Sequence, residues 1–146
     1  MSYAFDSNIL LRSIEANHPH QNEALGVINK LVGRGAEIVL LPQTLYEFWV
    51  VATRPTGTDN GLGLNAEDAA AVIAKFESFF PIQHDVPAMF HLWRQLVTQH
   101  SVLGKNSHDA RLAAAVLSHK IDHFVTFNKD HFKRFTGLSA LLPSEV

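Results

Sequence analysis

Four polar side chains stand at the ends or edges of otherwise apolar segments, and they are Asp6, Glu47, Asp109 and Asn128. In a parallel sheet the strand ends and the starts of the following helices lie on one edge, so all four can converge there. Three converging carboxylates repel one another in a partly dry crevice, and a divalent cation makes such an arrangement tolerable. Oxygen ligands favour Mg²⁺ or Mn²⁺. The pattern therefore predicts that Asp6, Glu47 and Asp109 hold a metal ion beside Asn128.

Each of these residues also has an ordinary structural explanation. Asp6 and Asp109 could serve only the starts of helices, as a cap or as acids favoured by the helix dipole. Glu47 could pair with a cation such as Arg12, and Asn128 could only form a turn. The joint placement of the four residues on one expected edge favours chemistry over these separate explanations.

Short apolar runs predict the strands that would carry these residues, at 3–6, 37–41, 121–126 and 139–142. A segment at 78–82 allows at most a short edge strand, because Pro81 cannot donate to a ladder. Helical spacing of apolar residues predicts helices between them, over 9–14, from Pro19 to 32, from Pro42 to 53, after a cap at Asn65, over 86–100 and over 109–119. This alternation predicts an α/β fold with a small, mostly parallel central sheet between two helical layers.

Composition limits the class of protein. The chain has 146 residues, of which 47% are hydrophobic and 18% charged, so we expect one compact domain over 1–146. The net charge of −2 shows no global basic field, although it allows a local patch. No apolar run approaches the ~18 residues of a membrane span and no signal pattern begins the chain. We therefore expect a cytoplasmic protein that does not enter a membrane.

Two other site chemistries are disfavoured by the residues present. The chain has no cysteine, which removes disulfides, thiol nucleophiles and cysteine zinc sites. Its nine histidines include no His-Glu-x-x-His pattern, so a protease-type zinc site is not expected either.

The ordered set of motifs resembles the PIN domain family, and within it the VapC toxins of bacterial toxin–antitoxin pairs. The motifs that carry the resemblance are Asp6-Ser7-Asn8, Glu47 after a Pro-led helix start, His108-Asp109-Ala110-Arg111-Leu112-Ala113-Ala114 and Thr126-Phe127-Asn128-Lys129-Asp130-His131-Phe132. The loop Asn60-Gly61-Leu62-Gly63-Leu64 is also similar to that subgroup. The resemblance covers essentially the whole chain and implies a three-layer α/β/α PIN-like fold.

The resemblance implies roles for individual residues. Asp6, Glu47 and Asp109 match the family's first acid, helix glutamate and third acid, and Asn8 matches a small polar residue beside the first acid. The fourth position, often an aspartate, is Asn128 here, so we expect one metal ion in the resting site. The implied activity is that of a Mg²⁺- or Mn²⁺-dependent ribonuclease with RNA as substrate and an antitoxin as partner.

Further residues are candidates for substrate and partner contacts. Besides Asn8, the cations Lys129, Lys133 and Arg134 could track an RNA backbone, with His131 and Phe132 stacking a base. Apolar residues in excess of an obvious core could form a groove for an antitoxin helix or a homodimer face, and they are Phe48, Trp49, Val50, Val51, Phe76, Phe79 and Phe80.

Two different functions compete with the ribonuclease. One is a non-catalytic PIN-like domain that uses the same crevice only to bind RNA or a protein, which Asn128 favours and the three retained acids oppose. The other is a phosphatase of the haloacid dehalogenase type built on Asp6. That chemistry needs an acid two residues after the nucleophile, where this chain has Asn8.

Overall fold

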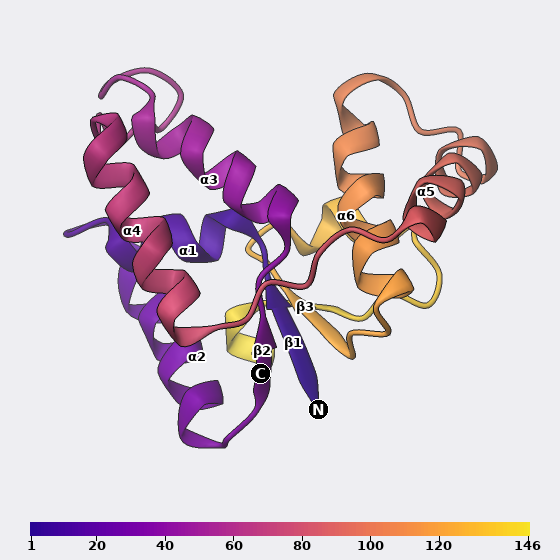
Figure 1. The fold of residues 1–146 in the computed structure, drawn as a ribbon, viewed down its shortest axis with the longest axis horizontal. Helices are drawn as coiled ribbons and strands as arrows, with labels where there is room; N and C mark the ends of the chain where they lie inside the picture. Colours follow the sequence, from indigo (N-terminus) through magenta and orange to yellow (C-terminus); the bar gives the residue numbers. More distant parts are fainter.

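A four-stranded parallel sheet forms the centre of the molecule in the computed structural model, which describes all residues 1–146 (Figure 1). The strands are β1 (Ser2–Phe5), β2 (Glu37–Val39), β3 (His123–Val125) and β4 (Ala140–Leu141). They lie in the order β2-β1-β3-β4, and each neighbouring pair is parallel. The predicted sheet is confirmed, and it is parallel throughout.

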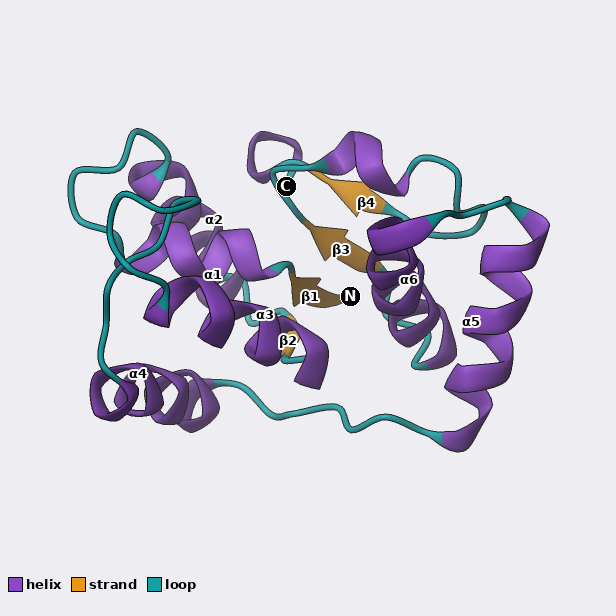
Figure 2. Ribbon diagram, turned by 90° about the horizontal axis from the view of Figure 1, so that it is seen from above, coloured by secondary structure: helices purple, strands orange, loops and turns teal.

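Helices cover both faces of this sheet. They are α1 (Ser7–Ile14), α2 (Gln21–Gly33), α3 (Pro42–Thr53), α4 (Ala66–Phe79), α5 (Pro87–Gln99) and α6 (Ser107–Ser118), with single 3₁₀ turns η1 (Gly104–Asn106), η2 (Lys129–Phe132) and η3 (Pro143–Glu145). Figure 2 shows α1 to α4 on one side of the strands and α5 and α6 on the other. The fold is therefore the expected three-layer α/β/α arrangement. None of its helices is long and apolar enough to cross a membrane.

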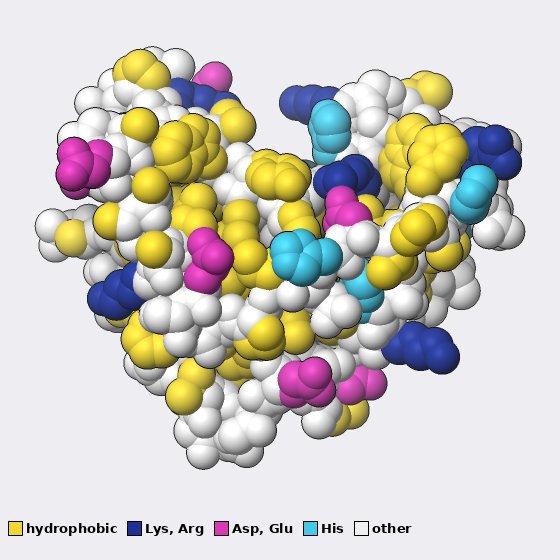
Figure 3. All heavy atoms as spheres, in the orientation of Figure 1, with side chains coloured by type: hydrophobic (Ala, Val, Ile, Leu, Met, Phe, Trp, Pro, Cys, Tyr) yellow, Lys and Arg dark blue, Asp and Glu magenta, His cyan; other side chains and the backbone are white.

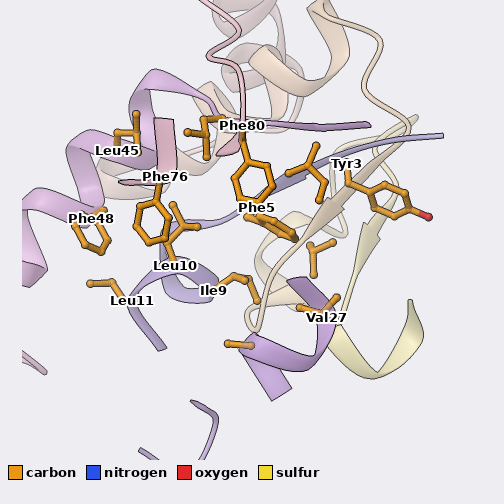
Figure 4. Packing of buried hydrophobic residues seen from close by; sticks show 14 of the residues in the cluster. Tyr3, Phe5, Ile9, Leu10, Leu11, Val27, Leu45, Phe48, Phe76 and Phe80 are labelled. Carbon is orange, nitrogen blue, oxygen red and sulfur yellow. The ribbon is translucent and has the colours of Figure 1, made fainter. Parts of the chain in front are cut away.

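The core has two halves, one on each face of the sheet. Alternate residues of β1 point to opposite faces, so Phe5 joins the half under α1 to α4 while Ala4 joins the half under α5 and α6. Figure 4 shows Phe5 and Phe80 beside the α1 residues of the first half. In the second half, fully buried alanines of α6 such as Ala113 let that helix lie close to the strands.

Several local boundaries differ from the sequence predictions, and strands β2, β3 and β4 are each shorter than expected. Asp6 lies just beyond β1 and caps α1, whereas the sequence placed it in the strand. Pro19 precedes α2, which begins at Gln21 after a turn. The segment around Pro81 forms only one isolated parallel bridge, between Leu40 and Ile82, which agrees with the expectation of at most a short edge strand.

Candidate active site

Asp6 is held at the carboxyl end of β1 by hydrogen bonds to both of its oxygens. The backbone N–H of Ser7 donates to Oδ1 at 2.7 Å, and the Thr126 hydroxyl donates to Oδ2 at 2.7 Å. The Asn8 amide also approaches Oδ2, at 3.4 Å. Asp6 is only 6% exposed, so these donors fix a buried carboxylate in one orientation. The capping role and a position in the site therefore coexist in one residue.

Glu47 faces the same region from α3. Its Oε1 accepts a hydrogen bond of 2.9 Å from the side-chain amide of Gln43, one helical turn earlier, and the Ser7 hydroxyl lies 3.4 Å from its Oε2. Glu47 forms no ion pair with any cation, and Arg12 pairs instead with Glu15. The structure therefore does not support the explanation that Glu47 serves only as a surface ion-pair partner.

Gln43 connects α3 to α6. Its buried side-chain amide donates to Glu47 and also to the backbone carbonyl of His108, at 2.8 Å. Its Oε1 accepts from the guanidinium of Arg111 at 2.9 Å, and the same guanidinium is ion-paired with Asp85 at 2.8 Å. Because His108 immediately precedes Asp109, one glutamine sets the relative position of two predicted acids.

Asp109 and Asn128 complete the set from α6 and from the segment after β3. Asp109 lies in the first turn of α6, and its Oδ2 is 3.8 Å from Nδ1 of His131. The backbone N–H of Asn128 donates to the Thr126 hydroxyl at 2.9 Å, and Asn128 itself is exposed. Thr126 thus links Asp6 to the start of the Asn128 segment.

All four predicted positions line one pocket of about 390 Å³, and Asn8 lines it too. Figure 3 shows the surface hollowed between the α1–α4 side and the α5–α6 side, with apolar side chains on both flanks. The carboxyl ends of the strands point toward this hollow in Figure 1. The prediction that strand ends and helix starts would bring these residues to one edge of the sheet agrees with their positions in the structure.

Asp6 and Glu47 are acids without a cationic partner, whereas Asp109 has His131 beside it. Burial raises the pKa of Asp6 to about 6, the nearby Glu47 and Asp109 carboxylates add to the rise, and the Thr126 and Ser7 donors oppose it. Burial also raises the pKa of Glu47, against the Gln43 amide, and raises the pKa of Asp109, against His131, His108 and Arg134. Neither Asp6 nor Glu47 has a cationic partner. Arg12 and Arg54 also line the pocket, but neither forms an ion pair with these acids, and Arg12 pairs with Glu15.

The predicted cations lie around the site and outside its lining. Lys129 pairs with Glu145 at 2.7 Å, and Lys133 pairs with Asp130 at 2.6 Å. Arg134 is exposed and close enough to lower the pKa of Asp109. Phe132, a candidate for stacking a base, is 2% exposed and packs against Phe124 in the core, so it offers no stacking surface.

The loop after α3 contributes three lining residues that motif spacing did not single out as functional. Arg54, Asp59 and Asn60 all line the carboxylate pocket. The loop folds back on α3, because Leu62 N–H donates to the Val51 carbonyl and Gly63 N–H to the Arg54 carbonyl. A Cβ at Gly61 would lie 2.3 Å from the Pro55 carbonyl oxygen, so only glycine fits that approach.

Two buried residues of the site were missed by sequence reasoning. Gln43 and Thr126 are 6% and 0% exposed, and each holds one of the acids. The available indications were modest: a polar residue one turn before Glu47, and a hydroxyl at the end of a buried strand. The sequence does not reveal which residues Gln43 and Thr126 contact, because those contacts depend on how α3, α6 and β3 pack together.

The donor set fits a hard divalent cation by its chemistry. The candidate ligands are carboxylate oxygens, with amide oxygens at the border of the pocket, and no cation neutralises Asp6 or Glu47. As the side chains stand, no three His, Asp or Glu residues approach closely enough to enclose an ion between them. Mg²⁺ usually keeps several waters and binds through one or two carboxylates, so the residues present suit that ion without a closed cage.

Fold and site together define a three-layer α/β/α protein with an acidic pocket at the carboxyl edge of a parallel sheet. The PIN domain family model matches residues 3–138, and the chain belongs to that family. The family predicted from the ordered motifs is therefore confirmed. None of the curated proteins compared with the chain matches it in sequence.

Solved structures of toxin–antitoxin proteins have the same fold. VapBC-1 from nontypeable Haemophilus influenzae gives a TM-score of 0.74 at 16% identity, covering 99% of each chain. VapBC2 from Rickettsia felis, bound to a DNA fragment from their promoter, gives 0.70 at 18% identity, covering 97% of this chain and 98% of that one. VapC20 from Mycobacterium tuberculosis, described as a toxin that cleaves the sarcin–ricin loop, gives 0.63 at 14% identity, covering 88% and 92%.

Proposed function

We propose that the protein is a Mg²⁺- or Mn²⁺-dependent endoribonuclease and the toxin of a VapBC-type toxin–antitoxin pair. The observation that carries this proposal is that Asp6 and Glu47, which have no cationic ion-pair partner, share one pocket with Asp109, and that all three carboxyl groups have raised pKa values. Membership of the PIN domain family supports it, as does the likeness in fold to a toxin that cleaves the sarcin–ricin loop.

Asp6 and Asp109 would hold the cation, with Glu47 completing the set directly or through water. When bound, the ion supplies a Lewis acid for the phosphodiester and makes water easier to deprotonate. The donors from Ser7 and Thr126 keep the Asp6 oxygens in place for this role. Asn128 adds no charge to the pocket, which favours one ion over two.

The chain's own residues then divide the work of hydrolysis. Glu47 would accept a proton from the attacking water, because its raised pKa brings it closer to neutral pH. Asn128 is placed to orient that water or a phosphate oxygen through its exposed amide. Arg134, which lies close enough to lower the pKa of Asp109, would supply positive charge for a phosphate. No protein nucleophile is required.

Cleavage of a structured RNA with Mg²⁺, with Mn²⁺ or with EDTA tests the proposal. We expect cleavage with either ion, none with EDTA, and losses of at least about 100-fold in Asp6→Asn and Asp109→Asn. Asp68→Asn is the matched control, because it removes an exposed acid of α4 that does not line the pocket. Activity in EDTA, or full activity in both pocket variants, would refute the mechanism.

A non-catalytic PIN-like domain that binds RNA or a protein is the second candidate, and Asn128 in a position often occupied by aspartate is what favours it. The same experiment separates the two functions. Retained RNA binding without cleavage in either metal would select the binding domain, whereas metal-dependent cleavage excludes it.

An antitoxin chain is the proposed partner, because proteins of similar fold form VapBC complexes. Of the apolar candidates, Val50 and Phe79 are 54% and 67% exposed, while three are buried in the core: Phe48, Phe76 and Phe80. We place the contact on α3, where exposed Tyr46 and Val50 line a groove of about 710 Å³ that also reaches Glu47.

A homodimer and a cytoplasmic site of action belong to the same proposal. Light scattering of the free chain would measure whether it is a dimer.

A further inference from the structure

A second pocket, of about 740 Å³, adjoins the carboxylate pocket. The two share Asn8, Arg12, Asn60 and Asn128 in their linings. The second pocket extends away from the acids toward the turn between α1 and α2 and the segment after β3. A strand that lay across the acids would therefore continue into this space.

Three rings form a row in this pocket. His18 and His20 have ring centroids 5.6 Å apart at 36°, and His20 and Phe127 have centroids 5.0 Å apart at 37°. The row joins residues from distant parts of the sequence, and all three rings line the pocket. Its spacing and tilt are those of packed aromatic side chains.

The rings are fixed by neighbours on several sides. Phe127 packs against the core, and its backbone N–H donates to Asn8 Oδ1 at 3.3 Å. His18 Nδ1 accepts from the His20 backbone N–H at 3.0 Å, and His20 Nδ1 lies 3.0 Å from Glu23. The His20 ring is nevertheless half exposed, so a flat ligand can reach it.

The charges of the pocket suit a neutral ligand. Arg12 is the only Lys or Arg in its lining, and Glu15 pairs with it at 2.6 Å. Glu23 adds a negative charge, which disfavours phosphate. The amides at the border shared with the acids can both donate and accept hydrogen bonds, and they come from Asn8, Asn60 and Asn128.

We propose that this second pocket binds one unpaired nucleobase of the RNA strand, stacked against the rings of His20 and Phe127. The proposal rests on the proposed function in one respect, that the strand's phosphate occupies the neighbouring carboxylate pocket. Flat rings favour any base, because every base has a stacking face, and the amides read its polar edge. The pocket thus selects single-stranded RNA next to the cleavage point.

Fluorescence of a single-stranded RNA that carries 2-aminopurine tests the pocket, with EDTA present so that no cleavage occurs. We expect quenching on binding to the wild-type chain, and about 5- to 150-fold weaker binding to His20→Ala and Phe127→Leu. His20→Phe should restore both, because it keeps the ring. His84→Ala is the matched control, an exposed histidine outside the pocket.

Steady-state cleavage by the same variants provides a second readout. The pocket predicts that His20→Ala raises KM and leaves kcat within about twofold, whereas loss of an acid lowers kcat. Unchanged affinity and quenching in both His20→Ala and Phe127→Leu would overturn the proposal. Because His20 is exposed, its variants remain informative if Phe127→Leu proves unstable.

The outcomes also separate this inference from the proposed function. Ring-dependent quenching by a chain that cleaves no RNA in either metal would leave the base pocket standing and refute the nuclease. Metal-dependent cleavage with the same KM in wild type and His20→Ala would support the nuclease and refute the base pocket.

Discussion

At the residue scale, Asp6 carries two roles with opposite effects on stability. Its carboxylate caps α1 through the Ser7 N–H, which favours folding. The same carboxylate is buried without a cationic partner, which costs free energy whenever it is ionised. Hydrogen-bond donors from Ser7, Asn8 and Thr126 hold the Asp6 carboxylate, but no cation of the chain neutralises its charge.

This conflict predicts an unusual pH dependence for the metal-free chain. The pKa of Asp6 rises from 3.8 to about 6 on folding, so the stability that its protonated form provides is complete below pH 3.8 and is lost as the pH rises through about 6. The difference corresponds to about 3 kcal/mol. We expect Asp6→Asn to remove this loss and to be the more stable chain above pH 6 in EDTA. Denaturant unfolding between pH 4 and 8 measures it, and coincident pH profiles of the two chains would contradict it.

Asn128 predicts a complementary change. Asn128→Asp adds one more carboxylate to the pocket, so we expect Mn²⁺ to bind on the order of tenfold more tightly, because affinity follows the charge of the ligand set. In EDTA the added repulsion should lower the midpoint of unfolding. Calorimetric titration with Mn²⁺ measures the first effect. If Asn128→Ala changed neither binding nor cleavage, the proposed role of the amide would be wrong.

At the scale of elements, the sequence was enough to predict which segments end at the site. Apolar runs followed by Asp6 and Asn128 mark strand ends, and parallel topology brings such ends to one edge. The hydrogen bonds that fix the acids could not be predicted in this way. Thr126 contacts Asp6 across 120 positions of sequence, and His20 contacts Phe127 across 107. Such long-range contacts depend on how the elements pack, which the periodicity of apolar residues in the sequence does not reveal.

Gln43 provides the test of how two elements are held together. Gln43→Leu keeps the volume but removes the donors to Glu47 and to the His108 carbonyl, so we expect a loss of about 1–3 kcal/mol in the free energy of unfolding. Because Glu47 also loses its orientation, kcat should fall more than KM changes. Gln95→Leu, an exposed glutamine of α5, is the matched control. A destabilised variant that kept its full kcat would show that Gln43 is only a structural link.

At the scale of the whole molecule, the distribution of charge is more informative than its total. The net charge is −2, and most cations near the two pockets are already paired within the chain. Arg12 pairs with Glu15, and Arg111 with Asp85. Lys129 pairs with Glu145 and Lys133 with Asp130, while Arg134 forms no ion pair. RNA would therefore meet few free positive charges, and its recognition would depend on the acidic site, the rings and the amides.

This arrangement predicts a shallow salt dependence for RNA binding. Each phosphate neutralised on a single strand contributes about −0.7 to the slope of log K against log salt, so two or three free cations give a slope no steeper than about −2. Arg134→Ala should reduce the slope by about one contact, whereas Lys133→Ala should leave it unchanged, because Lys133 is already paired with Asp130. Fluorescence anisotropy of a labelled RNA between 50 and ~300 mM KCl, with the Asp6→Asn chain to prevent cleavage, measures both slopes. A slope of about −4 or steeper would mean that the internal ion pairs open on binding and that phosphate contacts, not the ring-lined pocket, supply most of the affinity.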